Sequence, residues 1–286
     1  MMKFTIGCDP EIFLKKNGQP FPAHGIIPGT KENPFPTTHG AVQVDGLALE
    51  FNTVPVSIQD FGSFNKGIIR QIGCLREMVK GRGLNLSITS TQEFSKSVMD
   101  SLPDEAKILG CDPDWNAYTL ERNPTPDLTG NEGLRSAGGH IHLGYANDIP
   151  VDNEEHIAIC AEITKLLDLH VGLFMVLIDR NTKRREIYGK AGAFRPKPYG
   201  VEYRSPSSAW IKNRDYRKIV FYQVGRTVSE VRRGHFLKDI FGAPTEMGLQ
   251  DIINNGLARE ARQNLLSHLS PWSWEYTYID SLEVEE

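Results

Sequence analysis

Four short segments of the chain alternate between apolar and ionisable residues, which is the pattern of a β-strand with one buried and one polar face. The ionisable side chains in these segments are Asp9 and Glu11, Asp45 and Glu50, His140 and His142, and Glu202 and Arg204. Parallel sheets are covered on both faces, whereas an antiparallel sheet can leave one face to solvent. We therefore predict an α+β fold: one antiparallel sheet with helices on its apolar face and these ionisable side chains on its open face.

The other elements follow from helical periodicity and from the positions of glycine and proline. Pro10 cannot donate a ladder hydrogen bond, so its strand is expected at a sheet edge or with a bulge. Residues 15–40 are rich in Pro, Gly and His and are expected to form loops or short hairpins. The expected strands are 3–14, 43–52 (with a turn at Asp45-Gly46), 87–91, 137–145 and 201–205. The expected helices are 59–81, 153–178 and 214–233, followed by a helical stretch to residue 266 and a loose acidic end.

Composition narrows the class of protein. A chain of 286 residues can form one large domain, and a net charge of -4 gives no reason to expect a nucleic-acid partner. The cysteines form no CxxC pair, which argues against a thiolate zinc site and against disulfides: they are Cys8, Cys74, Cys111 and Cys160. The start lacks the apolar stretch of a signal peptide, and the longest apolar run, 171–178, is too short to span a bilayer. We expect a cytoplasmic protein with no membrane partner.

Several carboxylates on one sheet face repel each other and therefore predict a bound cation. Oxygen-rich sites suit Mg²⁺ or Mn²⁺, and an imidazole ligand favours Mn²⁺. Asp9 or Asp45 taken singly fits a solvated strand face equally well, but Glu11, Glu50 and Glu202 together do not. The pair His140 and His142 also occurs in zinc hydrolases, so a metal hydrolase is an alternative. The candidate metal ligands are Asp9, Glu11, Asp45, Glu50, His140 and Glu202.

A cationic run crosses residues 183–204, and its glycines and prolines predict a loop rather than a helix. Guanidinium groups bind phosphate oxygens in pairs, so a polyphosphate is the expected ligand. A solvated basic loop is the simpler interpretation for Lys183 or Arg184 alone. No Walker motif is present, and carboxylates with arginines predict metal-assisted phosphoryl transfer instead. The candidate nucleotide-binding residues are Arg185, Lys190, Arg195, Lys197, Arg204 and His142.

Five segments resemble the glutamine synthetase/glutamate–cysteine ligase superfamily, and most closely its phage-type carboxylate–amine ligase-like proteins. They are GCDPEIFL, GAVQVDGLALEFN, GCDPDWNAY, RSAGGHIHLG and YGKAGAFRPKPYGVEYRSPSSAW, within residues 7–210. The resemblance implies one catalytic domain over residues 1–286, with a helical part at 211–286. It also implies a curved sheet forming an open half-barrel that ATP enters at one end and the amino substrate at the other.

The resemblance also implies roles for individual residues. Glu11, Glu50 and Glu202 would bind divalent metal, and Asp9 and Asp45 are less certain ligands. His140 would be a ligand of metal or of a nucleotide phosphate. Arg195 and Arg204 would contact the ATP phosphates and an acyl phosphate, and with Glu202 they form the implied catalytic set.

The implied activity is amide formation from a carboxylate and an amine through an acyl phosphate, with ATP and Mg²⁺ or Mn²⁺. The chain is short and lacks an ammonia-site segment, so the expected amine is an amino acid, a peptide or a protein side chain. The general base is not identified; the loop before Gly40 and the 121–135 loop are the places considered. Alternatives are a phosphotransferase of the guanidino-kinase type, a metal hydrolase, and a non-catalytic binding or virion-associated protein. A phage enzyme would act in the host bacterial cytoplasm, and oligomeric state is not predicted.

Overall fold

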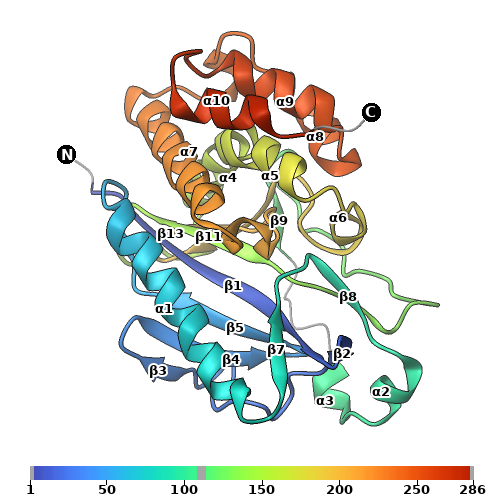
Figure 1. Cartoon of the computed structure of the whole chain (residues 1–286). Coiled ribbons are helices and arrows are strands. Elements are labelled where there is room, and N and C mark those ends of the chain that lie inside the picture. The colour runs from blue at the N-terminus through green and yellow to red at the C-terminus, as the bar shows by residue number, and fades with distance from the viewer. Residues whose placement is uncertain (1–2, 108–113, 284–286) are drawn as a thin grey trace.

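A computed structural model describes residues 3–107 and 114–283, so Cys111 lies outside the described residues. Its main feature is a large, open antiparallel sheet in the order β3-β4-β5-β1-β11-β13-β12-β9, with β2, β6 and β7 also paired to β1 (Figure 1). A second, two-stranded sheet joins β8 and β10. The strands are β1 (Thr5–Lys16), β2 (Gln19–Phe21), β3 (Phe35–Thr37), β4 (Gly40–Asp45), β5 (Ala48–Thr53), β6 (Val56–Ser57), β7 (Leu84–Ser87), β8 (Thr91–Glu93), β9 (Trp115–Asn116), β10 (Leu134–Ser136), β11 (Gly139–Gly144), β12 (Ala193–Lys197) and β13 (Gly200–Tyr203). The expected α+β fold with a large, open antiparallel sheet is confirmed.

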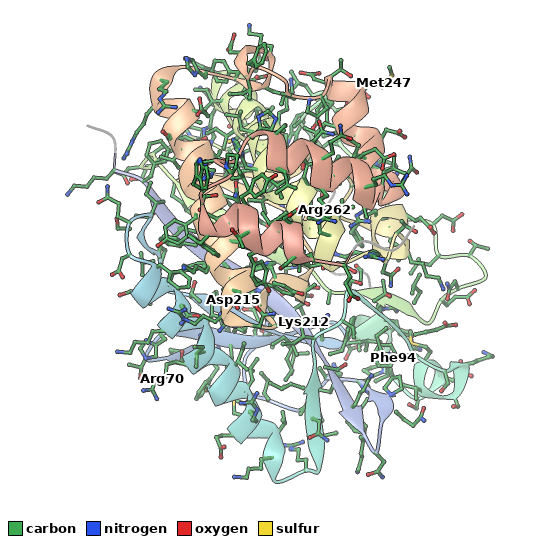
Figure 2. The ribbon with its side chains drawn as sticks, turned by 45° about the horizontal axis from the view of Figure 1, so that its top comes forward. Arg70, Phe94, Lys212, Asp215, Met247 and Arg262 are labelled. Atoms are coloured by element: carbon green, nitrogen blue, oxygen red, sulfur yellow. The ribbon has the colours of Figure 1, made fainter. Side chains whose placement is uncertain are left out.

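Long helices cover the apolar face of the sheet. Helix α1 packs on β4, β5 and β7, α4 packs on β12 and β13, and α7 lies between α1 and α4. The C-terminal helices form a further layer against α5; Figure 2 turns this layer toward the viewer, with Met247 of α8 and Arg262 of α9 on it. The helices are α1 (Phe61–Lys80), α2 (Lys96–Asp100), α3 (Asp104–Lys107), α4 (Glu154–Leu167), α5 (Leu173–Ile178), α6 (Lys183–Ile187), α7 (Arg214–Arg233), α8 (Glu246–Asn255), α9 (Ala258–Ser267) and α10 (Trp274–Ser281), with short segments η1 (Asp168–Gly172), η2 (Ser208–Ile211) and η3 (Leu237–Asp239). Among the helices within residues 3–107 and 114–283, none combines the length and apolarity needed to cross a bilayer.

Strand β1 is central, so the expectation of an edge strand at Pro10 is wrong. Antiparallel partners flank β1 on both sides: β11 pairs with residues 5–10, and β6 and β5 pair on the other side. The Glu11 amide donates to Gly138 of the β11 side, so the Pro10 nitrogen faces β5, between the Ile6–Val56 and Glu11–Glu50 pairs. Between these two pairs, four residues of β1 (7–10) face five of the partner chain (51–55), which is the count of a β-bulge. The hydrogen-bond ladder between β1 and its β5–β6 partner is interrupted at Pro10, so the missing amide donor of this proline costs no hydrogen bond.

A small cluster covers one end of the open face. Phe13 points away from the main core and packs with Ala48 and with Met99 of α2 and Ala106 of α3. The sequence predicted helices on one face of the sheet only. That prediction is wrong, because α2 and α3 cover one end of the opposite face. The cavity described below lies on the uncovered remainder of this face.

The long helix expected at 153–178 is present but contains a π-helical turn, η1. This turn carries Asp168, whose buried carboxylate accepts hydrogen bonds from Tyr118 Oη (2.9 Å), Tyr203 Oη (2.6 Å) and the Gly192 amide (2.6 Å). Burial raises the pKa of Asp168 to about 6 against the lowering effect of these bonds. Asp168 thus ties β12, β13 and the chain after β9 to the helix layer.

Three further expectations need correction. The strand expected at 87–91 is instead the end of β7 and the start of β8, with residues 88–90 between them. The end of the chain is not all loose, because α10 forms beyond residue 266 and packs on α9. The cationic run is not one loop, because it holds α6 and the hairpin of β12 and β13.

Candidate active site

A cavity of about 900 Å³ lies on the open face of the sheet. The side chains on its floor follow from strand register: His142 lies beside Gly7 on one side and Glu202 on the other, and Glu202 lies beside Arg195. Asp9 lies beside His140 in the next row, and Glu11 beside Glu50 beyond it. The predicted residues that line the cavity are Asp9, Glu11, Asp45, Glu50, His140, His142, Arg195, Lys197, Glu202 and Arg204. The convergence predicted from alternation is confirmed.

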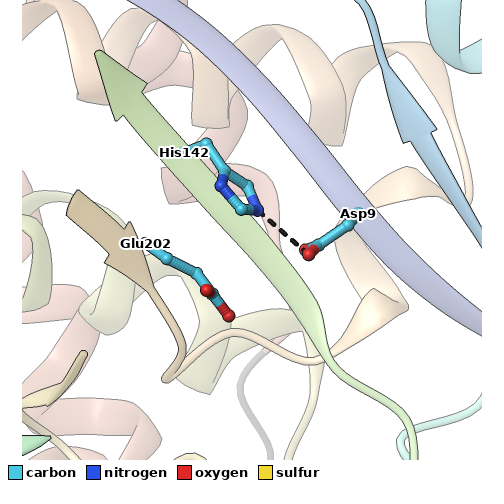
Figure 3. A group of neighbouring side chains, drawn as sticks. All are labelled: Asp9, His142 and Glu202. Carbon is cyan, nitrogen blue, oxygen red and sulfur yellow. Dashed lines mark ion pairs between the residues drawn. The ribbon is translucent and has the colours of Figure 1, made fainter. Parts of the chain in front are cut away.

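One group of possible metal ligands consists of Asp9, His142 and Glu202, whose ligand atoms lie within 4.8 Å of one another (Figure 3). Asp9 contacts both imidazoles, at 3.0 Å from His142 Nε2 and 3.3 Å from His140 Nδ1. Burial alone would raise the pKa of Asp9, but His142 and His140 outweigh it and hold this pKa far below its usual range. Asp9 is therefore ionised and available to a cation.

Glu202 lies at the centre of a cationic cluster and is almost fully buried. Its carboxylate is bonded to Arg204 and lies 2.8 Å from Lys197 Nζ, 3.7 Å from Arg195 Nη1 and 3.6 Å from His140 Nδ1. Burial would raise the pKa of Glu202, but Arg204 and the neighbouring histidines and lysine hold it well below its usual range. One carboxylate among Arg204, Lys197 and Arg195 leaves an excess of positive charge in the part of the cavity around Glu202.

A second group of possible metal ligands, Glu11, Asp45 and Glu50, has an excess of negative charge instead. The ligand atoms of these carboxylates lie within 4.8 Å of one another. Burial and then the charge of Asp45 raise the pKa of Glu11 to about 7, although the Gly138 amide donates to it at 2.7 Å. Burial and the nearby Asp9, Asp45 and Glu11 raise the pKa of Glu50 well above its usual value. Three crowded carboxylates that resist ionisation fit a divalent cation with oxygen ligands.

The pKa values of the two histidines are shifted in opposite directions. Burial and then Arg204 lower the pKa of His140 to about 4, which leaves its imidazole neutral at pH 7. Burial would lower the pKa of His142 too, but Asp9 reverses the effect and raises it. His142 Nδ1 also lies 2.5 Å from Tyr199 Oη at the edge of the cavity. His140 is therefore neutral and able to offer a ring nitrogen to a metal, whereas His142 is the histidine whose ligand atom lies close to those of Asp9 and Glu202.

The structure divides the cationic run into two parts. Arg195, Lys197 and Arg204 lie in the cavity because β12 and β13 carry them to the sheet face. Arg185 does not, since its guanidinium donates to the Asp179 carbonyl at 2.8 Å behind the sheet. Lys190 is exposed and lines a separate cavity of about 260 Å³. Neither Arg185 nor Lys190 is placed for the nucleotide role predicted for it.

Four residues that the sequence did not single out belong to the site. Asp114 is buried and accepts from Arg204 Nε at 3.1 Å, and Gln43 donates to Glu50 at 3.0 Å. Lys31 lies 3.6 Å from Asp45, and Tyr199 contacts His142. Asp114 falls within the segment GCDPDWNAY, which was recognised without a role for this aspartate. Lys31 and Gln43 gave no signal, since a lysine in a loop and a glutamine in a strand are ordinary.

Comparison with known protein families gives a match over part of the chain. Residues 129–237 match the model of the family described as phage phiEco32-like COOH.NH2 ligase-type 2. The match confirms, over this part of the chain, the resemblance to phage-type carboxylate–amine ligase-like proteins, and it supports a ligase. It contains β11, β12 and β13, and with them His140, His142, Arg195, Glu202 and Arg204. The curated proteins include no match to this chain.

Proposed function

We propose that this protein is an ATP-dependent carboxylate–amine ligase that works through an acyl phosphate. The observation that supports it is one cavity with a carboxylate cluster suited to a divalent cation and, along the same sheet face, Arg195, Lys197 and Arg204 around Glu202. A polyphosphate with a bound divalent metal carries both signs of charge and complements this arrangement. The substrates are a small-molecule, peptide or protein-side-chain carboxylate and amine.

Glu11, Asp45 and Glu50 would hold one Mg²⁺ or Mn²⁺, and Asp9, Glu202 and His140 or His142 would hold a second. The metal, when bound, neutralises phosphate oxygens during transfer. Arg195 and Lys197 would bind the polyphosphate. Arg204 is held on two sides, by Asp114 and Glu202, so its guanidinium is oriented before substrate arrives.

In the proposed reaction a carboxylate oxygen attacks the γ-phosphorus of ATP, the bond to the bridging oxygen breaks, and ADP leaves. The amine nitrogen then attacks the acyl carbon, inorganic phosphate leaves, and the amine loses one proton. A phosphorylated carboxylate is a far better acyl donor than a free one, which is why ATP is needed. Arginine and lysine in the cavity would stabilise the charge on the transferring phosphoryl group.

An oxygen-transfer experiment tests this mechanism. With a carboxylate substrate labelled with ¹⁸O in both oxygens, one labelled oxygen is expected in each inorganic phosphate released, because the attacking oxygen leaves with phosphorus. Mass spectrometry of the phosphate, over pools of amino acids and peptides, measures it. A phosphotransferase would instead retain phosphate on its product, and a hydrolase would act without ATP; unlabelled phosphate from an active enzyme would contradict the acyl phosphate.

Metal binding is expected to strengthen as pH rises from about 6 to about 8. Protons compete with the metal for Glu11 and Glu50 because burial and mutual repulsion raise the pKa of both. Deprotonation with rising pH removes this competition, so binding releases protons at neutral pH. Calorimetry with Mn²⁺ in buffers of different ionisation enthalpy measures the released protons. Affinity that is flat or falls over this range would show that the cluster is not the binding site.

A further inference from the structure

A small recess adjoins the main cavity on the far side of the carboxylate cluster. Its volume is about 50 Å³, and it shares Glu11, Asp45, His140 and Arg204 with the main cavity. Its remaining walls include Arg135 and Arg184, and Ala48 contributes a short side chain. The two spaces therefore meet at the residues of the proposed metal and phosphate site.

Arg135 adds positive charge to this recess, which the carboxylates of Glu11 and Asp45 also line. Its side chain is 8% exposed, and among the described residues no carboxylate lies within ion-pair distance of it. Its guanidinium is fixed by hydrogen bonds to the carbonyls of Glu132 (2.7 Å), Leu134 (2.8 Å) and Lys107 (2.9 Å), while its Nε has no acceptor within the described part of the chain. A buried cation without an anion is unfavourable, so an anionic ligand would stabilise it.

Arg184 is likewise held by backbone carbonyls: it is 3% exposed, and its terminal nitrogens donate to the carbonyls of Ser205 (2.6 Å) and Arg204 (3.1 Å). Burial lowers its pKa, and the charges of Glu11 and Asp179 act in the opposite direction. Its Nε also lacks an acceptor among the described residues. Two rigid, buried guanidinium groups with unused donors line one recess, and neither is used by the mechanism above.

The size of the recess limits the anion. Its volume is on the order of the space of one or two water molecules, about 30 Å³ each in the liquid. A carboxylate group fits, whereas the triphosphate of a nucleotide requires the main cavity. The geometry points to a binding site for the carboxylate of the acyl-donor substrate, built by Arg135 and Arg184 with Ala48 as its floor. This inference rests on the proposed function.

The position of the recess suits the first step of the proposed reaction. In-line phosphoryl transfer needs the attacking oxygen and the leaving ADP on opposite sides of the γ-phosphorus. A nucleotide in the main cavity and a carboxylate in the recess would approach the shared residues from two sides. Arg204 borders both spaces and would contact the transferring group from either side.

The carboxyl line width of [1-¹³C]acetate with the protein and Mg²⁺ tests the site by binding alone. Ala48→Val fills the recess without removing an arginine, and Arg135→Gln removes the cation. In both we expect acetate affinity to fall by at least about tenfold, as for loss of a charge-assisted contact or its space. The matched controls are Ala41→Val, on β4 of the same hairpin, and Arg217→Gln, a buried arginine bonded to Asn65 and the Ile211 carbonyl. Controls within about twofold of wild type are expected.

Hydroxylamine, which converts acyl phosphates to hydroxamates, provides the second measurement. With acetate and ATP, KM for acetate should rise in Ala48→Val while calorimetric affinity for MgADP stays unchanged. Acetate that fails to bind the wild type, or binds all four variants equally, would overturn the recess as a carboxylate site while leaving ATP-dependent ligation intact. A third outcome separates the two proposals. If the two recess variants lose acetate binding but the wild type forms neither hydroxamate nor ADP, the recess is supported as a carboxylate site and the proposed function is refuted.

Discussion

Glu202→Gln is expected to reduce the rate of metal-dependent ADP release by about 10²–10³-fold or more, which is the effect of removing an electrostatic element from an active site. The carboxylate is the common partner of Arg204, Lys197 and Arg195 and a candidate metal ligand. Glutamine keeps the shape but not the charge, so the cations repel one another and the metal loses a ligand. Steady-state ADP release with saturating Mg²⁺ measures the effect.

Glu230→Gln provides the matched control, because Glu230 also pairs with an arginine and a histidine but lies on α7, outside the cavity. Its activity should stay near that of the wild type. Circular dichroism of both variants separates lost chemistry from lost folding. A Glu202→Gln protein that folds and releases ADP at the wild-type rate would exclude Glu202 from the chemistry.

Glu50→Gln is expected to stabilise the metal-free protein at pH 8, the opposite of what most buried substitutions do. Burial and neighbouring carboxylates raise the pKa of Glu50, so the folded state holds its proton more tightly than the unfolded state. That preference contributes fully to stability below the unfolded-state pKa, and it is lost, as a penalty relative to a neutral side chain, as pH rises from there through the folded-state pKa. A neutral amide removes the penalty, and we expect a gain of about 1–3 kcal/mol in unfolding free energy at pH 8.

Thermal unfolding at pH 5 and pH 8, with and without Mn²⁺, distinguishes this effect from ordinary repacking. At pH 5 the variant should resemble the wild type, and the stabilisation that Mn²⁺ gives the wild type at pH 8 should be reduced. Glu93→Gln, at an exposed position on β8, is the control and should change neither. A variant that is less stable at pH 8 than the wild type would contradict carboxylate repulsion in this cluster.

Side-chain alternation was sufficient to predict which residues face the site. Asp9 and Glu11, or Glu202 and Arg204, are two apart on one strand and must share a face. The same rule placed Glu50 opposite Leu49 and Phe51, which are in the core. Caps predicted helix limits equally well, since Asn153 and Gly81 cap α4 and α1. These are local properties, and sequence reasoning is reliable for them.

Pairing between distant segments was beyond local reasoning. Pro10 predicted a strand that is either at a sheet edge or bulged, and no local feature of the sequence decides between the two. The structure places its nitrogen where the ladder with the neighbouring strand is interrupted. The π-helical turn at Asp168 depends on partners from three other segments. Arg185 and Lys190 were grouped with Arg195 because the three lie close together in a cationic stretch of the sequence. In the structure Arg185 is on α6 and donates to the Asp179 carbonyl, and Lys190 lies after α6 and lines a separate cavity. A role for Asp114 could not be predicted from the sequence, because it depends on the hydrogen bond that Asp114 accepts from the distant Arg204.

The central position of β1 also separates the two ligand clusters in time as the chain emerges from the ribosome. Glu11, Asp45 and Glu50 lie on β1 and on β4 and β5, so their strands can pair after about 53 residues have been made. Asp9, by contrast, meets His142 and Glu202 only when β11 and β13 exist, nearly two hundred residues after β1. Contacts so distant in sequence form late in folding because loop closure must come first. A nascent chain would thus carry three crowded carboxylates well before the arginines of β12 and β13 are present to complete the site.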